Sequence, residues 1–233
     1  MDPHPVTDNK RISIQVSLSG YSFKVETSTG ERLSSSPGWL GPGEVFTTPE
    51  LQRRYDEVDI SLMTPKFTLV PSAFLTPGEE REALASVVDL APSDEVKVTG
   101  VPRLGASLVY SLSIGETLSR MIAQSLPTPD GRPARILPEI WYLLRDLEKV
   151  PDFNKIIASL ADGQLYLTIA QGNALQLANV FRAPDFTTAE YFIFLAIKQL
   201  QINPELSTIH FRTPLDPAEE MSLYRYFKSV NTL

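Results

Sequence analysis

The sequence predicts an α/β protein built from two similar halves. Each half opens with short segments in which apolar and polar residues alternate, the pattern of half-buried strands. Each of these groups is followed by a segment with helical periodicity, a further short apolar segment and a second helical one. The opening turns of the two halves contain Gly20 and Gly163.

Composition limits the function classes. The 233 residues include no cysteine, are 42% hydrophobic and 21% charged, and carry a net charge of −7. This balance is that of a globular protein, and it excludes disulfides and thiolate metal sites. The sequence has no basic stripe for nucleic acid, no basic run for an anionic membrane, no signal peptide and no spanning segment. We expect a soluble, cytoplasmic protein that binds neither nucleic acid nor membranes.

The first half begins with a hairpin. Residues 1–10 predict a flexible tail, and residues 12–18 and 21–25 alternate on either side of a turn at Ser19-Gly20. The elements expected next are a short strand near Arg32, a loop over 34–43, a helix from Thr48 with Pro49 in its first turn, strands at 58–63 and 66–70, a helix capped by Thr76 that runs to about Leu90, strands at 96–98 and 107–112, and a helix from Ile114 to about Ser125.

The second half repeats this order after a turn-rich loop at 127–133 and a helix at 138–149. A three-stranded meander is expected first, with turns at Asp162-Gly163 and Gly172-Asn173. The predicted elements are strands at 155–160, 165–169 and 174–181, a helix at 187–200, a strand at 208–211, and an amphipathic C-terminal helix carrying Leu223, Tyr226, Phe227 and Val230.

The order meander, helix, strand, helix is that of a ribonuclease-H-like module, and two such modules in tandem make the actin-like architecture. The sequence therefore predicts a first module over 11–112, a helical connection over 113–150 that completes it, and a second module over 151–233.

Several strings carry a resemblance to a known family. They are Ser13–Gly20, Phe67–Pro71, Leu177–Phe181 and Thr188–Phe192. They resemble an uncharacterised bacterial family, a domain of unknown function assigned an actin-like ATPase fold. The resemblance covers nearly the whole chain and implies the fold, but it implies no activity because none is established for the family.

An actin-like fold raises the question of ATP. In actin-like ATPases the first turn of each meander carries an acidic residue that holds the Mg²⁺-nucleotide, and backbone N–H groups there cradle the phosphates. The turn at Ser19-Gly20 has no carboxylate, and Phe211–Pro214 stands where a glycine pair is expected beside the adenosine. The Asp162-Gly163 turn keeps one acid, but this pair also favours a two-residue hairpin because both residues tolerate positive φ.

Other polar candidates have structural interpretations. His4 and His210 cannot supply a metal site or a catalytic triad by themselves, and His210 is expected to be structural. The pairs Glu79-Glu80 and Glu219-Glu220 are expected in the first turns of helices, where acids favour the helix dipole.

Two apolar features could contact a partner. Trp39-Leu40 lies in a glycine-rich loop that lacks the ending of a P-loop, and it is either tucked into the protein or offered to a partner; we favour tucking. The helix around 189–197 is apolar on nearly all sides, which favours burial on both sides over a partner or dimer surface.

The sequence thus favours a non-catalytic interaction or scaffold protein on a degenerate actin-like ATPase fold, with no cofactor, an unidentified protein partner and the possibility of a homodimer. The alternative is an ATP-binding protein or weak ATPase that uses the cleft between the modules. In that case Ser19, Gly20, Asp162 and Gly163 would bind ATP with magnesium.

Overall fold

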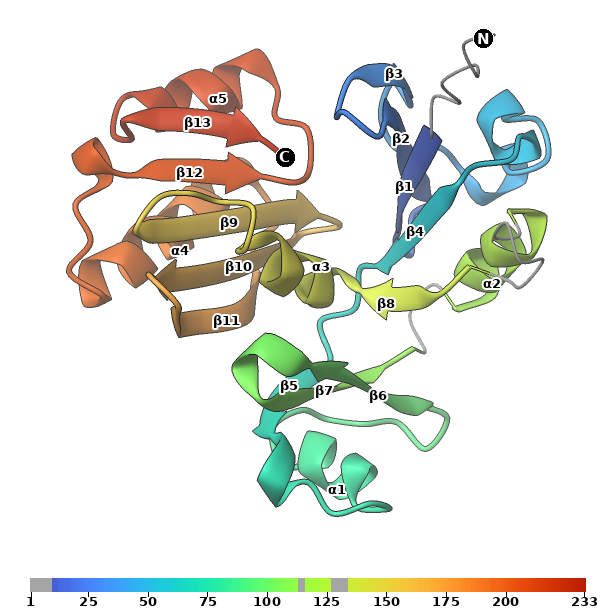
Figure 1. The fold of residues 1–233 in the computed structure, drawn as a ribbon, viewed down its shortest axis with the longest axis horizontal. Helices are drawn as coiled ribbons and strands as arrows, with labels where there is room; N and C mark the ends of the chain where they lie inside the picture. The colour runs from blue at the N-terminus through green and yellow to red at the C-terminus, as the bar shows by residue number, and fades with distance from the viewer. Residues whose placement is uncertain (1–9, 113–115, 127–133) are drawn as a thin grey trace, which may run out of the picture. The chain divides into compact units, whose positions relative to one another are not determined.

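A computed structural model of the chain describes residues 10–112, 116–126 and 134–233 (Figure 1). These residues form two compact units, each made of two separate stretches of sequence. The first unit contains the described residues up to Thr64 together with those of Leu112–Pro138, and the second contains Pro65–Ser111 and Glu139–Leu233. The module boundaries expected from the sequence stay a prediction.

The first unit is built on a five-stranded sheet in the order β3-β2-β1-β4-β8. β1, β2 and β3 form an antiparallel meander, and β4 and β8 continue the sheet in parallel with β1. Alternate residues of β1 enter a core that is completed by Leu118 and Ile122 of α2. The elements of this unit are β1 (Lys10–Val16), β2 (Tyr21–Thr27), β3 (Arg32–Ser35), the 3₁₀ turns η1 (Pro42–Glu44) and η2 (Pro49–Gln52), β4 (Glu57–Leu62), α2 (Glu116–Ser125) and β8 (Ile136–Pro138).

The second unit contains a five-stranded sheet in the order β11-β10-β9-β12-β13. β9, β10 and β11 form the meander, and β12 and β13 run parallel to β9. The elements are α3 (Glu139–Asp146), β9 (Asn154–Ala161), β10 (Gln164–Gln171), β11 (Ala174–Arg182), α4 (Phe186–Gln199), the 3₁₀ turn η5 (Pro204–Leu206), β12 (Thr208–Phe211), α5 (Pro217–Tyr224) and β13 (Ser229–Thr232).

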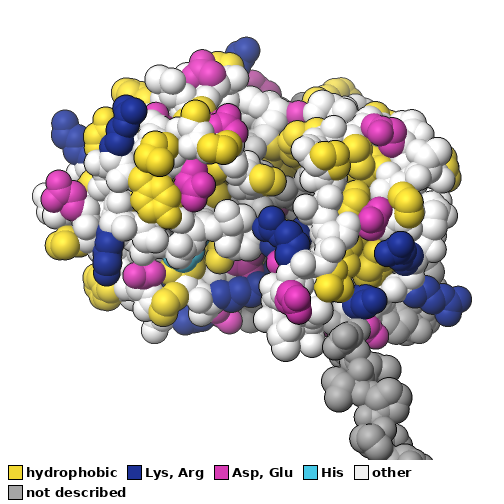
Figure 2. Space-filling model, turned by 90° about the horizontal axis from the view of Figure 1, so that it is seen from above, with side chains coloured by type: hydrophobic (Ala, Val, Ile, Leu, Met, Phe, Trp, Pro, Cys, Tyr) yellow, Lys and Arg dark blue, Asp and Glu magenta, His cyan; other side chains and the backbone are white. Residues whose placement is uncertain are grey.

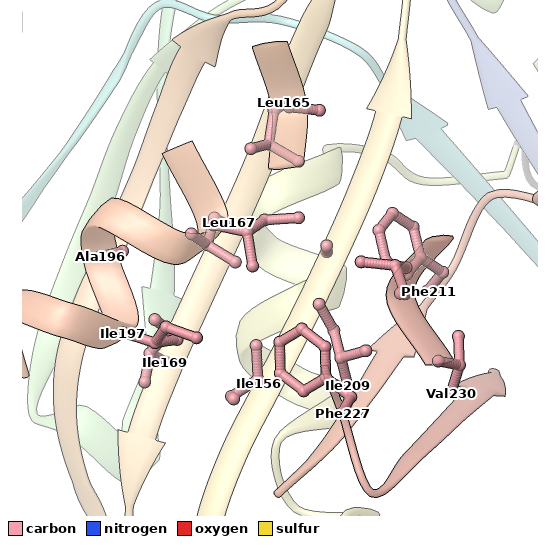
Figure 3. Close-up of a cluster of buried hydrophobic side chains, with 14 of the residues drawn as sticks. Ile156, Leu165, Leu167, Ile169, Ala196, Ile197, Ile209, Phe211, Phe227 and Val230 are labelled. Atoms are coloured by element: carbon pink, nitrogen blue, oxygen red, sulfur yellow. The ribbon is translucent and has the colours of Figure 1, made fainter. Parts of the chain in front are cut away.

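Alternation along the strands decides what each face of this sheet contacts. Leu165, Leu167 and Ile169 of β10 share one face and pack with apolar residues of α4, as the close-up in Figure 3 shows. Tyr166 and Thr168 point to the opposite face, which α3 covers. This second face contains the buried side chains of Ser159, Thr168 and His210.

The remaining strands of the second unit form a small antiparallel sheet in the order β5-β7-β6 with one short helix. Its elements are β5 (Phe67–Pro71), the 3₁₀ turn η3 (Ser72–Phe74), α1 (Glu80–Ala85), β6 (Val96–Val101), the 3₁₀ turn η4 (Pro102–Leu104) and β7 (Ala106–Ser111). The strands expected at 66–70, 96–98 and 107–112 are confirmed, but they form a sheet of their own and do not extend the sheet of the first half.

The predicted hairpins, the second meander, α3, α4 and β12 are confirmed within one to three residues. The expected tail over residues 1–9, the start of the helix at residues 114–115 and the loop at 127–133 lie outside the described residues. β8 was not predicted; it is three residues long and pairs with β4 through Ile60 and Ile136.

Two predicted helices of the first half are wrong in type or length. The helix expected at Thr48 is the single 3₁₀ turn η2, because the Thr48 hydroxyl donates to the Glu44 carbonyl (2.9 Å) and contacts the Tyr21 hydroxyl (2.7 Å), so it does not cap a helix. The helix expected from Thr76 begins only at Glu80, because Gly78 has a φ of +96°, which helical residues do not adopt.

The C-terminal helix is also shorter than expected. It begins with a capping box in which the Asp216 carboxylate accepts hydrogen bonds from the N–H groups of Ala218 and Glu219. It ends at Tyr224, and Val230 lies in β13 opposite Ile209. The β-branched side chain of Val230 is 5% exposed at this sheet edge. A longer C-terminal helix would instead have carried this side chain outward.

Candidate functional site

The turn between β1 and β2 is closed by contacts within the protein. The Ser17 N–H donates to the Gly20 carbonyl (2.9 Å), and the Ser17 hydroxyl contacts the Ser19 hydroxyl (3.1 Å). A Cβ atom at Gly20 would lie 1.9 Å from the Leu40 carbonyl oxygen, and Gly20 has a φ of +153°. Glycine is therefore required here by the close approach of another backbone segment.

That segment is the Trp39-Leu40 loop. Leu40 pairs with Tyr21 as an isolated bridge, in which each N–H donates to the other's carbonyl at 2.9 and 2.7 Å. The Leu40 side chain packs against the core of the first unit, whereas Trp39 keeps 38% of its surface exposed. The structure thus places the two residues differently: Leu40 is tucked against β2, and Trp39 faces outward in part.

The turn between β9 and β10 is a two-residue hairpin loop. Ala161 pairs with Gln164, and the two residues between them have φ values of +49° for Asp162 and +67° for Gly163. Positive φ at both positions is the requirement of a type I′ turn, which explains the Asp-Gly pair by backbone geometry. The Asp162 side chain is exposed, and the Gly163 carbonyl accepts a hydrogen bond from the Ala183 N–H (2.8 Å).

Arg212 follows β12 and lies in a buried ion-pair network. Its Nε donates to Glu139 Oε1 at 2.9 Å, and its Nη1 pairs with Asp146 Oδ2. The Glu139 and Asp146 side chains are 0% and 2% exposed, and Arg212 is 11% exposed. The Ser159 hydroxyl donates to Glu139 (2.7 Å), and the guanidinium lies 5.1 Å from the ring centre of Tyr142. The positive charge at this strand end is thus directed into the protein.

The charges of this network set its protonation states. Burial by itself would raise the pKa of Asp146, but the positive charges of Arg212, Arg145 and Lys149 outweigh it and lower the pKa to about 2. Burial would lower the pKa of Arg212, but Glu139 and Asp146 raise it. Arg212, Asp146 and Glu139 are each paired with a group of opposite charge, and this pairing offsets the cost of burying them.

Two further buried polar side chains lie on the same face of the sheet. The Tyr166 hydroxyl has no hydrogen-bond partner among the described residues, and burial raises its pKa well above the ordinary value. His210 is 5% exposed, its Nε2 lies 3.7 Å from Asp152 Oδ2, and burial lowers its pKa although Asp152 opposes this. His210 is a buried residue in the middle of β12, in keeping with its expected structural role.

The other candidate residues serve helix ends. Glu80 accepts a hydrogen bond from the Gly78 N–H (3.0 Å) at the start of α1, and Glu219 accepts one from the Asp216 N–H (2.9 Å) in the capping box of α5. Glu79 is the N-cap residue of α1, and Glu220 lies in the first turn of α5. In the described parts of the chain, no three His, Asp or Glu side chains gather in a way that could hold a metal ion.

The apolar helix α4 is covered on one side only. Ala189, Ile193 and Ile197 face the sheet, but Tyr191 is 61% exposed. The expectation that this helix is buried on both sides is therefore wrong, because its outer stripe is in contact with solvent. Phe194 packs edge-on against Tyr226, which is itself 49% exposed. On the face of the molecule in Figure 2, hydrophobic side chains, in yellow, are interspersed with charged ones.

A cavity of about 220 Å³ lies within the second unit, between α3, the start of β11 and the loop after β6. We call it the basic pocket. Its apolar wall consists of Val101, Leu104, Trp141, Leu144, Leu147 and Leu175. Its charged residues are Arg103, Arg145, Lys155 and Glu148.

Sequence reasoning missed both the network and the basic pocket. Glu139 and Arg212 are 73 residues apart, and each has an ordinary local explanation as a helix-start acid or a residue after a strand. Only Trp141, which is one of two tryptophans in the chain, was a visible signal that a large side chain had to be accommodated near α3.

None of the described helices has the length and apolar character needed to cross a bilayer.

Solved structures with a similar fold include two that align over most of their length. A Bacteroides thetaiotaomicron protein with actin-like ATPase fold and unknown function matches with a TM-score of 0.67 and 16% identity, over 100% of this chain and 94% of that one. The PilM-PilN type IV pilus biogenesis complex matches with a TM-score of 0.51 and 12% identity, over 96% of this chain and 88% of that one. These likenesses confirm the predicted actin-like ATPase fold.

No curated protein matches the sequence. The sequence pattern of one family, described as protein of unknown function (DUF3822), matches residues 42–230. This match covers most of the chain and confirms the predicted resemblance to an uncharacterised family. The chain belongs to the DUF3822 family and has the actin-like ATPase fold.

Proposed function

We propose that this protein is a non-catalytic interaction protein on an actin-like fold whose nucleotide site has degenerated. The observation that carries the proposal is the closed first turn. Backbone N–H groups of such a turn would have to point at a phosphate. Here the Ser17 N–H is bonded to Gly20, and the Tyr21 N–H is bonded to Leu40.

The second turn and the end of β12 support the same proposal. The Asp162-Gly163 pair meets the geometric requirement of its hairpin without a ligand. Arg212 is the nearest cation in sequence to the end of β12, and it is neutralised by Glu139 and Asp146. A nucleotide phosphate would have to compete with two buried, charge-assisted bonds.

We further propose that the chain consists of two ribonuclease-H-like modules in tandem. The support is the matching strand order of the two five-stranded sheets, in which the third, second and first strands of a meander precede two parallel strands. On this view, β1 corresponds to β9 and β4 corresponds to β12, and the Gly20 and Gly163 turns occupy equivalent positions.

The cysteine-free composition supports a location of the protein in the reducing cytoplasm.

Exposed apolar side chains supply surfaces for an interaction. Tyr191, Met221 and Tyr226 are 61%, 61% and 49% exposed on or just after α4 and α5. Aromatic residues and methionine are enriched at protein interfaces relative to other surfaces. These helices are therefore one surface on which a partner or a second copy of the chain could be bound.

Calorimetric titration of the whole chain with Mg-ATP and with Mg-ADP tests the proposal. We expect no heat of binding up to millimolar nucleotide. The matched variant is Asp162→Asn, since asparagine tolerates positive φ and keeps the turn while the charge is removed. Micromolar binding that disappears in this variant would overturn the proposal in favour of an ATP-binding protein.

A further inference from the structure

We infer that the basic pocket receives one large apolar side chain from an acidic peptide segment of a partner protein. This inference rests on the proposed function, because it assigns a site and a chemical class to the interaction. It is carried by the volume of the pocket, by the charge of its lining and by its position at the edge of a sheet.

The volume fits a side chain and not a nucleotide. Sites for drug-sized ligands and cofactors occupy about 300–1,000 Å³. The basic pocket occupies about 220 Å³, below that range, and its wall is formed by leucines, Val101 and the indole of Trp141. Buried aromatic or aliphatic anchors in pockets of this kind contribute much of the binding energy of protein interfaces.

The charges select the segment that carries the anchor. Arg103, Arg145 and Lys155 line the pocket with one acid, Glu148, whereas the whole chain has a net charge of −7. Arg145 also pairs with Asp146 (Nε to Oδ1, 3.0 Å), so Arg103 and Lys155 are the cations that a peptide would contact. A local excess of positive charge on an acidic protein attracts acidic segments and repels basic ones. We therefore expect aspartates or glutamates next to the anchor.

Lys155 and Arg103 are placed to donate hydrogen bonds to such carboxylates. The Lys155 ammonium donates to the Leu147 carbonyl (3.0 Å), which leaves part of its three-donor capacity unused. Arg103 donates to Asn173 Oδ1 through Nη2 (2.9 Å) and pairs with Glu148 through Nη1 (3.0 Å). The Arg103 and Glu148 side chains are 45% and 52% exposed, and exposed pairs contribute little. A peptide carboxylate can replace Glu148 there at small cost.

The position of the pocket suits an extended peptide. Leu175 lies at the start of β11, which is the last strand of its sheet, as Figure 1 shows. A peptide that runs along this edge can form main-chain hydrogen bonds while an alternate side chain enters the pocket. Near the other end of β11 the Val180 N–H is already bonded to the Asn179 side chain (2.9 Å), so we assign the segment around Leu175.

Fluorescence of Trp141 provides a direct test. The chain has two tryptophans, and Trp39→Phe leaves Trp141, in the pocket wall, as the only one. This protein is titrated with a short peptide in which one phenylalanine is flanked by aspartates and glutamates. The comparison peptides carry lysines in place of the acids, or alanine in place of the phenylalanine.

We expect the acidic phenylalanine peptide to shift the Trp141 emission at micromolar concentration and both comparison peptides to bind at least about tenfold more weakly. Lys155→Gln and Arg103→Gln, each in the same background, are expected to weaken binding about five- to tenfold. The matched control is Lys198→Gln, which removes the same charge from the exposed side of α4 and should change the affinity less than twofold.

Three results would each overturn the inference: equal binding of the acidic and lysine peptides, unchanged affinity in both pocket variants, or no emission shift at millimolar peptide.

The nucleotide titration separates this failure from failure of the proposed function. If the peptides do not bind and Mg-ATP gives no heat of binding, only the assignment of the pocket is wrong. If Mg-ATP binds through Asp162, the proposed function falls whatever the peptides do.

Discussion

At the scale of single residues, Arg212 shows that a buried charge is tolerated only while all of its charged partners are present. Its guanidinium contacts Glu139 and Asp146, both of which are almost fully enclosed. Such a network adds little net stability over apolar residues of the same size, but removal of one member leaves the others uncompensated and costs about 3–5 kcal/mol. The network therefore fixes how α3 is held against the end of β12.

Asp146 gives this network a pH dependence. Its pKa is lowered from 3.8 to about 2, so the unfolded chain binds its proton first as the pH falls. The contribution of Asp146 to the free energy of unfolding, roughly 2 kcal/mol, is present above about pH 4 and is lost as the pH falls toward 2. We expect Asp146→Asn to be destabilised at pH 7 and the difference from the parent protein to narrow below pH 4.

Urea denaturation at a series of pH values measures this difference. Asp89→Asn is the control, because it removes the same charge from an exposed position and should change stability by no more than about 0.5 kcal/mol at any pH. A gap between Asp146→Asn and the parent protein that stays constant from pH 7 to pH 2 would show that the Asp146 carboxylate is not held as the network requires.

At the scale of elements, short-range patterns were reliable where backbone geometry alone decides. The Asp162-Gly163 hairpin, the β9–β11 meander and the place of Glu219-Glu220 in the first turn of α5 all follow from turn chemistry, period-two alternation or the helix dipole. The prediction of a helix at Thr48 was wrong because the Thr48 hydroxyl is hydrogen-bonded to the Tyr21 hydroxyl, and Tyr21 lies 27 positions earlier in the chain. Helix propensity depends on neighbouring residues and does not include a hydrogen-bond partner that is distant in sequence.

The turn between β1 and β2 offers a prediction of the same kind. Gly20→Ala places a Cβ atom 1.9 Å from the Leu40 carbonyl oxygen, so the Leu40 segment or the turn must move. We expect a loss of at least about 2 kcal/mol in the free energy of unfolding, measured by urea denaturation. Gly43→Ala is the matched control, since its Cβ would meet no atom within 4 Å. Equal effects of the two substitutions would contradict the close approach.

At the scale of the whole molecule, charge distribution matters more than total charge. The net charge of −7 opposes binding to polyanions, whereas the basic pocket concentrates three cations in a small volume. Neutralisation of many phosphates along a duplex requires a stripe of basic residues. The peptide site that we propose requires only one or two carboxylates at one small pocket.

We therefore expect no saturable binding of duplex DNA at micromolar protein, even at about 50 mM salt, where phosphate contacts are strong. Fluorescence anisotropy of a labelled duplex measures this, with a basic DNA-binding protein as the positive control. Saturable binding that weakens steeply with salt would reveal a phosphate-binding surface that the composition does not indicate.

The sequence by itself determined the α/β class, the hairpins, the second meander and the family resemblance, because these depend on alternation and turn residues that are neighbours along the chain. It also identified the Ser19-Gly20 turn as lacking a carboxylate. Only the tertiary structure decided that Leu40 closes this turn, that Arg212 is buried between Glu139 and Asp146, and that three cations surround one cavity. These contacts join residues from 20 to more than 70 positions apart, and which faces meet at such separations depends on how the folded elements pack.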